Sequence, residues 1–192
     1  MCACSRSCWG GTTYANGSMT RGTKDVQTVT SGGEKIEVVP VGVTFRDLQT
    51  HVDDRGWVCE LFNPAWGWHS DPLAHAYVFT VRPGVAKGWG RHDHTEDRYA
   101  ILSGEAEVVM YDARPDSSTH GLVSVVTLSE FRRRLMNMPT GIWHAVRNVG
   151  TSDVVIVNFK TKAFDPENPD KFRLPLDTEE IPYQFPAGTR GG

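Results

Sequence analysis

Residues 139–148 read PTGIWHAVRN. A Pro-x-Gly triplet is typical of a tight turn, and the apolar and β-branched residues that follow are typical of a strand. The turn fixes the point at which this strand begins, and so it also fixes the direction in which the side chain of His144 projects. This stretch predicts a strand that presents a histidine at a defined place.

Short strand-like segments lie on both sides of this stretch, separated by turns rich in Gly, Pro and Asp. They are EKIEVVPVGVTF (34–45), WVCELF (57–62), AYVFTVRP (76–83), RYAILSG (98–104), EAEVVMYDA (105–113), LVSVVTL (122–128), HAVRNV (144–149) and DVVIVNFK (153–160). VVIVNF (154–159) is apolar on both faces, which predicts a buried central strand. LSEFRRR (128–134) is either a helical turn capped by Ser129 or a loop. The pattern predicts an all-β sandwich or barrel.

Composition divides the chain into three parts. Residues 1–33 are rich in Gly, Ser and Thr and are expected to form a flexible arm. The β-rich domain is expected over 34–165, and the Pro-rich residues 166–192 are expected to pack on its surface. Cys2, Cys4 and Cys8 lack the C-x2-C spacing and the fourth ligand that a structural zinc site needs.

The net charge and the hydropathy of the chain argue against two classes of protein, those that bind nucleic acid and those that span a membrane. A net charge of −3 and a pI near 6.1 argue against a nucleic-acid surface. No apolar run reaches the roughly 18 residues that a membrane-spanning helix needs. The N-terminus also lacks the apolar stretch of a signal peptide, so the expected compartment is the cytoplasm.

The stretch at 139–148 matches P-x-G-x2-H-x3-N, the second motif of the cupin jelly rolls, at every fixed position. The segments around it resemble the dTDP-4-dehydrorhamnose 3,5-epimerase branch of the cupins over roughly residues 40–182. These segments are DDRGWVCELF (53–62), VRPGVAKGW (81–89), YDARPDSSTHG (111–121) and NFKTKAFDPENPD (158–170). The resemblance implies an RmlC-like jelly-roll barrel with His144 facing its cavity. It also implies a homodimer, with the strand at about 35–46 exchanged or packed at the interface.

A metal site depends on KGWGRHDHTEDRYAILSG (87–104). The first cupin motif is H-x-H-x3–4-E-x6-G, and counting back from Gly104 places Asp97 at the glutamate position. His92 and His94 are then out of step, and on a continuous strand they would point away from Asp97. A β-bulge would restore a site for a divalent transition metal made by His92, His94, Asp97 and His144. Without it the histidines line a polar cavity, and we expect no cofactor.

The residues that the resemblance assigns to epimerase chemistry are mostly replaced. The family's catalytic base is a histidine directly after an R-G-L-type triplet, whereas Gly90 follows Lys87-Gly88-Trp89 here. The catalytic tyrosine precedes a lysine, and Phe159 stands at that place before Lys160. A second tyrosine corresponds to Phe164, and the enolate-stabilising lysine corresponds to Asp97. We therefore expect no true 3,5-epimerase.

A histidine beside a carboxylate is suited to moving a proton, and an aromatic cavity suits a partly apolar, oxygenated ligand. We predict catalytic roles for His92, His144 and Asp97. The residues expected to bind substrate are Trp89, Arg98, Tyr99, Trp143, Phe159, Lys160 and Phe164, and Trp57, Trp66 and Trp68 add further aromatic surface. The predicted function is acid–base isomerisation, epimerisation or cyclisation of a sugar nucleotide or natural-product intermediate. A metal-dependent cupin oxygenase or isomerase and a non-catalytic ligand-binding cupin remain as alternatives.

Overall fold

The computed structural model describes residues 24–192, and the chain divides between Ile36 and Glu37 into two units. In the first unit, residues 24–36 contain a turn closed by a bridge between Val29 and Lys35. Cys2, Cys4 and Cys8 lie outside the described residues. The second unit, residues 37–192, contains the strands and the cavity described below.

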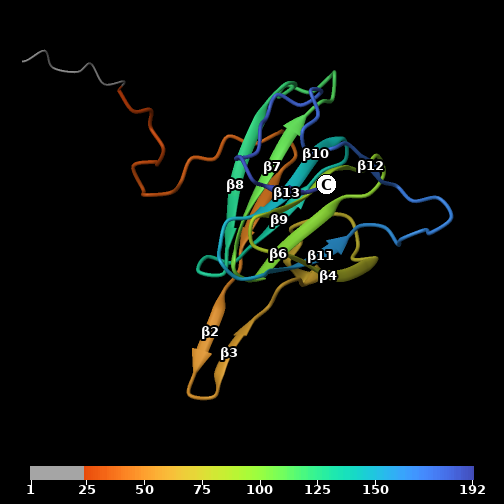
Figure 1. Cartoon of the computed structure of the whole chain (residues 1–192). Coiled ribbons are helices and arrows are strands. Elements are labelled where there is room, and N and C mark those ends of the chain that lie inside the picture. The colour runs from red at the N-terminus through yellow and green to blue at the C-terminus, as the bar shows by residue number, and fades with distance from the viewer. Residues whose placement is uncertain (1–23) are drawn as a thin grey trace, which may run out of the picture. The chain divides into compact units, whose positions relative to one another are not determined.

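Two mainly antiparallel sheets form a jelly roll (Figure 1), which confirms the all-β prediction. The five-stranded sheet has the order β1 (Thr44–Asp47), β9 (Arg134–Met138), β6 (Asp97–Ser103), β11 (Val154–Lys160) and β4 (His75–Val81). The facing sheet has the order β12 (Phe172–Arg173), β5 (Val85–Arg91), β10 (Ile142–Asn148), β7 (Glu105–Asp112) and β8 (Val123–Ser129). A further strand, β13 (Arg190–Gly191), pairs with β5 in parallel. The stretch VVIVNF forms an interior strand, as predicted, because β11 lies between β6 and β4.

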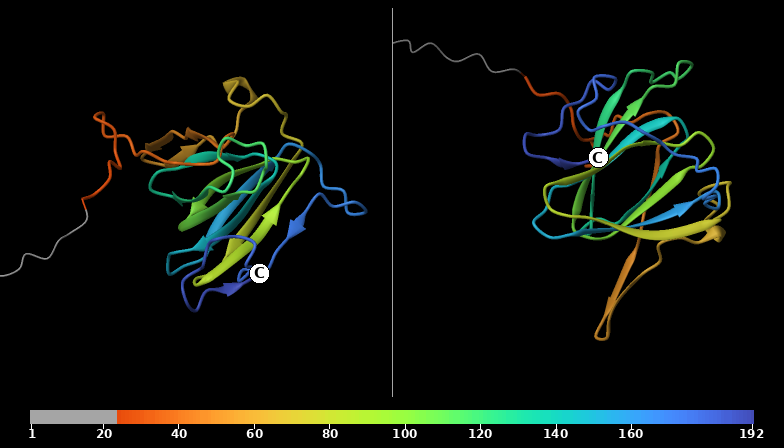
Figure 2. Two further views of the ribbon diagram at one scale, coloured as in Figure 1. Left: turned by 90° about the horizontal axis from the view of Figure 1, so that it is seen from above. Right: turned by 45° about the vertical axis from the view of Figure 1, so that its right-hand side comes forward.

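A short hairpin and one helical turn stand apart from these sheets. The hairpin is made by β2 (Thr50–Asp53) and β3 (Gly56–Cys59), and it projects from the barrel in Figure 1 and in the right-hand view of Figure 2. Among residues 24–192 the only helical element is the 3-10 turn η1 (Pro64–Trp66), which Asn63 caps. No helix in this range is long and apolar enough to cross a membrane.

The helical turn considered at 128–134 is absent. Ser129 ends β8, and its hydroxyl accepts the Phe131 backbone N–H at 3.2 Å, so it stabilises a tight turn into β9. Serine is equally favourable in turns and at helix N-termini because both use the same side-chain-to-backbone bond.

Side-chain alternation builds three apolar layers. On β10, Ile142 and Val146 point between the sheets, whereas Ala145 points outward. The residues between the sheets form the largest cluster. A second cluster covers the outer face of the five-stranded sheet, where residues 61–68 pack against Ala100 and Phe159. A third covers the outer face of β5, β10 and β7, where the chain from 174 to 185 packs against Trp89.

A β-bulge in β5 sets the inner wall of the barrel. Gly90 lies opposite His144, but Lys87 lies opposite Val146, so one extra residue is inserted between them. Gly88 takes φ +141° at this point, and a Cβ there would lie 2.5 Å from the Ala145 Cβ. The close approach of β5 to β10 therefore requires glycine at this position.

A matched pair of substitutions tests this close approach. Gly88→Ala should lower the free energy of unfolding by roughly 3 kcal/mol, because it adds both a steric overlap and a disfavoured φ. Gly90→Ala should cost nothing and could add up to about 1 kcal/mol, because its nearest contacts are 3.8 and 4.0 Å away. Urea unfolding of both variants measures the difference. Equal stability of the two variants would contradict the close packing of β5 on β10.

Candidate active site

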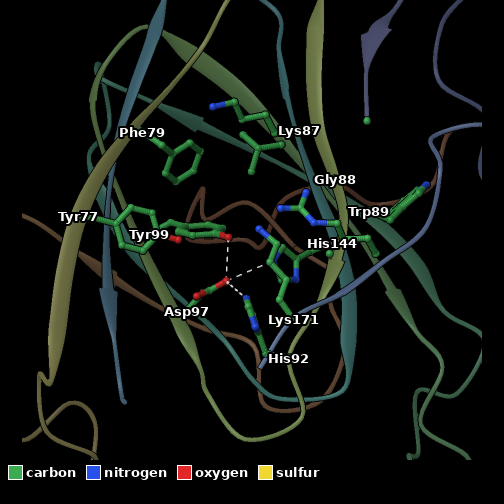
Figure 3. Close-up of a pocket in the computed structure, with 14 residues that line it drawn as sticks. Tyr77, Phe79, Lys87, Gly88, Trp89, His92, Asp97, Tyr99, His144 and Lys171 are labelled. Atoms are coloured by element: carbon green, nitrogen blue, oxygen red, sulfur yellow. Dashed lines mark hydrogen bonds and ion pairs between the residues drawn. The ribbon is translucent and has the colours of Figure 1, made fainter. Parts of the chain in front are cut away.

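The inner wall carries a cavity of about 350 Å³ between the two sheets (Figure 3). Its floor is polar and its upper part is apolar and cationic. The side chains that line it include Tyr77, Phe79, Lys87, His92, Asp97, Tyr99, His144, Lys171 and Arg173. A second cavity of about 320 Å³ shares Tyr77, His92 and Lys171 with the first.

The floor is organised by the carboxylate of Asp97, which is 2% exposed. Its Oδ2 lies 3.3 Å from Nε2 of His92 and 3.3 Å from Nε2 of His144. The same oxygen accepts the hydroxyl of Tyr99 at 3.0 Å. Groups from β6, β10 and the loop after β5 therefore converge on one oxygen atom.

The other carboxylate oxygen of Asp97 is held from β11. Its Oδ1 accepts the side-chain amide of Asn158 at 2.8 Å and lies 3.1 Å from the Lys160 ammonium. Lys160 Nζ also lies 3.3 Å from His92 Nε2. The charge of the buried carboxylate is thus matched by a cation and by several hydrogen-bond donors, as burial requires.

Both histidines are oriented by backbone carbonyls. Nδ1 of His144 donates to the carbonyl of Ile142 at 3.1 Å, and Nδ1 of His92 donates to the carbonyl of Asp170. Because a carbonyl can only accept, Nδ1 carries the hydrogen in each ring. Nε2 is therefore the nitrogen at which each histidine can take up or release a proton inside the cavity.

Burial and hydrogen bonding act in opposite directions on Asp97. Burial raises its pKa, but hydrogen bonds from His144 and His92, together with their charges, hold the pKa well below the usual range. Asp97 is thus an anion at neutral pH and can stabilise a proton on either imidazole. Burial, followed by the charge of Asp97, raises the pKa of Tyr99 well above its ordinary value, so this phenol stays protonated.

The loop between β5 and β6 separates the two histidines of the first motif. β5 ends at Arg91 and β6 begins at Asp97, so the intervening residues do not follow strand alternation. His92 turns into the barrel, whereas His94 is exposed and its backbone N–H bonds Asp170 at 3.0 Å. The β-bulge that the metal site with His94 required is absent, because residues 92–96 form a loop rather than a strand.

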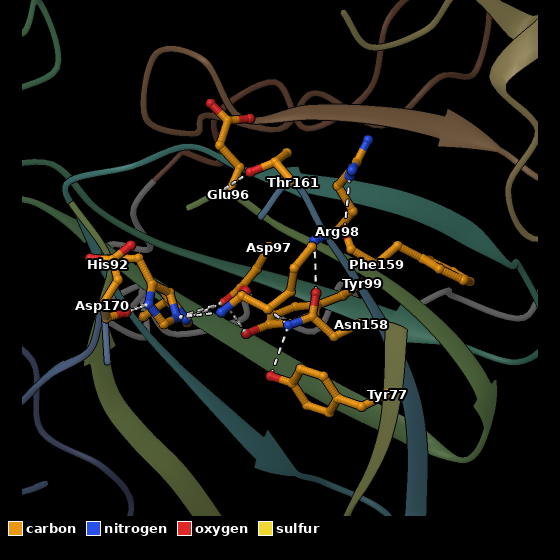
Figure 4. Close-up of polar contacts among 12 residues, drawn as sticks. Tyr77, His92, Glu96, Asp97, Arg98, Tyr99, Asn158, Phe159, Thr161 and Asp170 are labelled. Carbon is orange, nitrogen blue, oxygen red and sulfur yellow. Dashed lines mark hydrogen bonds and ion pairs between the residues drawn. The ribbon is translucent and has the colours of Figure 1, made fainter. Parts of the chain in front are cut away.

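Two residues expected to bind substrate, Arg98 and Phe159, lie outside the cavity. The Arg98 guanidinium donates to the carbonyl of Phe159 (Figure 4). On the outer face it also donates to the carbonyls of Asp71 and Pro72. Phe159 stacks on Phe62 in the outer cluster. The side chains of 98 and 159 leave the cavity because their strand neighbours, 97, 99 and 158, face inward.

Four tryptophans among the described residues also lie on the outer faces of the sheets. Trp89 and Trp143 belong to the layer that the chain from 174 to 185 covers, although the backbone of Trp89 borders the cavity. Trp66 and Trp68 belong to the layer over the five-stranded sheet, and Trp57 lies on the projecting hairpin. The aromatic groups inside the cavity are instead Tyr77, Phe79 and Tyr99. Phe164 lines the second cavity.

Sequence reasoning missed several cavity residues. They are Tyr77, Phe79, Lys87, Lys171 and Arg173, and sequence reasoning also missed Asn158, which donates to Asp97. Asn158 carried a detectable signal, since it is the one polar residue within the apolar run 154–159. Lys171 carried none, because only the folded chain brings residues 171–173 against β5.

Lys171 occupies the space that Gly90 leaves open. A Cβ at position 90 would point into the cavity, 3.8 Å from Lys171 Cε and 4.0 Å from His144 Nε2. Burial, followed by the charge of Arg173, lowers the pKa of Lys171. Gly90 stands at the position of the family's base, and Lys171 from a distant part of the chain fills the space beside it.

The floor could also hold a metal ion. The ligand atoms of His92, Asp97 and His144 lie within 4.8 Å of one another. Histidines whose Nδ1 donates to a carbonyl are common among metal ligands, so this donor set fits a divalent transition metal. The ammonium of Lys160 lies beside the same carboxylate, however, and a second cation there would be repelled.

The jelly roll and the cavity define an RmlC-like cupin related to the dTDP-sugar epimerases. Residues 51–172 match the polysaccharide biosynthesis C-terminal domain, and the chain belongs to this family. The chain is 33% identical to the probable low-salt glycan biosynthesis epimerase Agl13 of Haloferax volcanii, over 78% of this chain and 96% of the relative.

Two further comparisons agree with this family assignment. The spore coat polysaccharide biosynthesis protein SpsL of Bacillus subtilis is 33% identical, over 75% of this chain and 95% of the relative. The crystal structure of a dTDP sugar isomerase from Desulfovibrio desulfuricans superposes with a TM-score of 0.71 and 25% identity, covering 76% of this chain and 91% of that one. The chain thus falls within a sugar-nucleotide epimerase-like family with relatives in glycan biosynthesis.

Proposed function

We propose that this protein epimerises or isomerises a nucleotide-activated keto sugar by moving a proton at one carbon next to the ketone. The observation that carries the proposal is the buried cluster of His92, Asp97 and His144 at the cavity floor, where both Nε2 atoms lie 3.3 Å from one carboxylate oxygen. An imidazole beside a fixed carboxylate is suited to accept a proton at neutral pH.

The charges around the cluster suit an enolate intermediate. When Nε2 of His144 takes the proton from carbon, the C–H electrons move into the ketone and leave a negative oxygen. Asp97 stabilises the imidazolium that forms. The ammonium of Lys171, which reaches into the cavity near His144, can stabilise the oxyanion.

The cations of the cavity favour a nucleotide-linked substrate. Lys87, Lys171 and Arg173 all line it, and charged donors of this kind bind phosphate oxygens. The dTDP sugar isomerase reported above acts, by its description, on this class of compound. We therefore place a sugar nucleoside diphosphate in the cavity, with the sugar toward Asp97 and the diphosphate toward the cations.

Proton exchange tests the reaction and the histidines together. In D2O, wild-type protein should place deuterium at one carbon of dTDP-4-keto-6-deoxyglucose, as read by NMR. His144→Gln and His92→Gln should slow this exchange by about a hundredfold or more, because glutamine cannot carry the proton. His94→Gln, the matched control, should remain within about threefold, since His94 lies outside the cluster.

Three results of this experiment would contradict the proposal. Deuterium at both carbons would indicate 3,5-epimerisation. If His144→Gln exchanged the proton as fast as wild type while His94→Gln did not exchange it, the site would have to lie at His94 instead. Tight binding of the sugar nucleotide without any exchange would favour a non-catalytic ligand-binding cupin.

We further propose that the reaction needs no metal. Lys160 already supplies a positive charge beside Asp97, and Tyr99 and Asn158 satisfy other positions on the same carboxylate. Exchange activity should therefore survive exhaustive treatment with a chelator, with less than about a twofold change. A stoichiometric transition metal by elemental analysis, removed with loss of activity, would instead support the metal-dependent alternative and its ligands His92, Asp97 and His144.

We also propose that the protein acts as a homodimer. β1 and β4 are the edges of the five-stranded sheet, and edge strands can pair with another chain. Val78 on β4 is 59% exposed, and Trp57 and Val58 on the hairpin are 58% and 64% exposed. Such apolar groups are frequently covered by a partner.

Sedimentation tests the assembly. At micromolar concentration the particle should have twice the 21.3 kDa mass of the chain. Val78→Lys should shift it toward monomer, because it places a charge on the exposed edge, whereas Val149→Lys in the turn after β10 should not. A monomeric wild-type protein would overturn the proposal.

A further inference from the structure

An epimerase needs a second proton donor, facing the sugar from the side opposite the base. The tyrosine that the family uses for this purpose is Phe159 here, and its ring lies in the outer cluster. The cavity nevertheless contains two phenols, Tyr77 on β4 and Tyr99 on β6. Their hydrogen bonds distinguish them.

The hydroxyl proton of Tyr99 is already used. Tyr99 Oη donates to Asp97 Oδ2 at 3.0 Å, and the residue is almost fully buried. Donation to substrate would break this bond and leave the carboxylate one partner short. Tyr99 therefore holds Asp97 in place.

The hydroxyl of Tyr77 is held in the opposite sense. Asn158 accepts the backbone N–H of Arg98 with its Oδ1 at 3.0 Å, which fixes the orientation of the amide. The amide nitrogen then donates to Asp97 Oδ1 at 2.8 Å and to Tyr77 Oη at 3.0 Å (Figure 4). Since Tyr77 accepts this bond, its own proton is left to donate, and among residues 24–192 it has no acceptor.

The two sheets place this proton across the cavity from the base. Tyr77 belongs to the five-stranded sheet and His144 to the facing sheet. Figure 3 shows Tyr77 on one side of the cavity, His144 and Lys171 on the other, and Asp97 between them. A sugar ring above Asp97 would have an imidazole on one face and a phenol on the other.

We propose that Tyr77 is the catalytic acid that returns a proton to the second face of the enolate, and that Asn158 is the residue that positions it. This inference rests on the proposed function. Burial, followed by the charge of Asp97, raises the pKa of Tyr77, so the phenol keeps its proton until the enolate forms. The proposed acid therefore lies on β4, whereas the position of the family's tyrosine, Phe159, lies on the neighbouring strand β11.

The step balances without any other reactant. Nε2 of His144 removes the proton, and the C–H electron pair becomes the enolate. The enolate carbon then takes the hydroxyl proton of Tyr77 on its other face, and the new C–H bond uses the same electron pair. The imidazolium loses its proton to water and the tyrosinate regains one, which restores the starting state.

Removal of the acid should separate two readouts that the wild-type protein gives together. In D2O with dTDP-4-keto-6-deoxyglucose, Tyr77→Phe should still exchange the proton of the recovered, unchanged sugar within about threefold of wild type. Formation of the epimer should fall by about a hundredfold or more, because general acids contribute that much. Tyr99→Phe, the matched control, should reduce exchange and epimer formation in parallel.

Asn158→Asp tests the positioning role. The substituted side chain can still accept the Arg98 N–H, but an ionised carboxylate cannot donate to Tyr77 Oη. Asn158→Asp also removes a donor from Asp97, which lies beside His144, so it lowers proton exchange and epimer formation together. The ratio of epimer formed to proton exchanged therefore reports on Tyr77 alone. This ratio should fall as it does in Tyr77→Phe. A purely structural role of Asn158 would leave it unchanged.

The outcomes separate the two proposals. Suppose that the wild-type protein both exchanges the proton and forms the epimer. If Tyr77→Phe then still forms the epimer, or loses exchange and epimer formation equally, Tyr77 is not the acid. The proposed function is unaffected by either result. A wild-type protein that exchanges no proton of the probe would overturn the proposed function, and this role with it.

Discussion

The carboxylate of Asp97 lies between two apolar sheets, and the inner wall of the barrel is arranged around it. A buried carboxylate that loses one of its partners costs about 3–5 kcal/mol, so the fold must deliver donors to both of its oxygens. The donors come from β10, β11, β6 itself and the loop after β5. Because both oxygens of Asp97 need hydrogen-bond donors when the carboxylate is buried, the residues that supply them are held in one geometry.

Several backbone features follow from this requirement. The bulge in β5 brings both Lys87 and Gly90 to face the cavity, and the close contact at Gly88 draws β5 against β10. The Pro-Thr-Gly turn is tied to the other histidine, because the Gly141 N–H donates to the His92 carbonyl at 2.8 Å. The two histidines are therefore positioned by one connected piece of backbone rather than independently.

The outer aromatic layers leave the cavity free for polar chemistry. Trp66 and Trp68 cover one sheet, and Trp89 and Trp143 lie under the chain from 174 to 185 on the other. Residues 172–173 then pair with β5, and the same segment brings Lys171 into the space beside His144. The last part of the chain thus supplies both covering for the sheet and charge for the site.

Local patterns predicted the fold and part of the site, and long-range placement accounts for the remainder. PTGIWHAVRN and the short strands were enough for the jelly roll, because turn and strand preferences are local. His92, Asp97 and His144 were predicted as a group, and His94 was added to them only for a metal site that needed a β-bulge. The structure has a loop between β5 and β6 instead, and His94 is exposed there. Arg98 was predicted at the cavity together with Asp97, and Phe159 because it corresponds to the family's catalytic tyrosine. Alternation from Asp97 and Asn158 turns both side chains outward. Lys171 could not be found, since Gly90, whose open space it fills, is 81 residues away in sequence.

Asp97 holds both imidazoles with Nε2 toward one carboxylate oxygen. Long-range ¹H–¹⁵N correlation spectra of histidine-labelled protein at pH 7, for wild type and Asp97→Asn, test it most directly. We expect a hydrogen on Nδ1 of both His92 and His144 in the wild-type protein, and a large change of both Nε2 signals in the variant. A bare Nδ1 on either ring, or Nε2 signals that do not respond to Asp97→Asn, would contradict it.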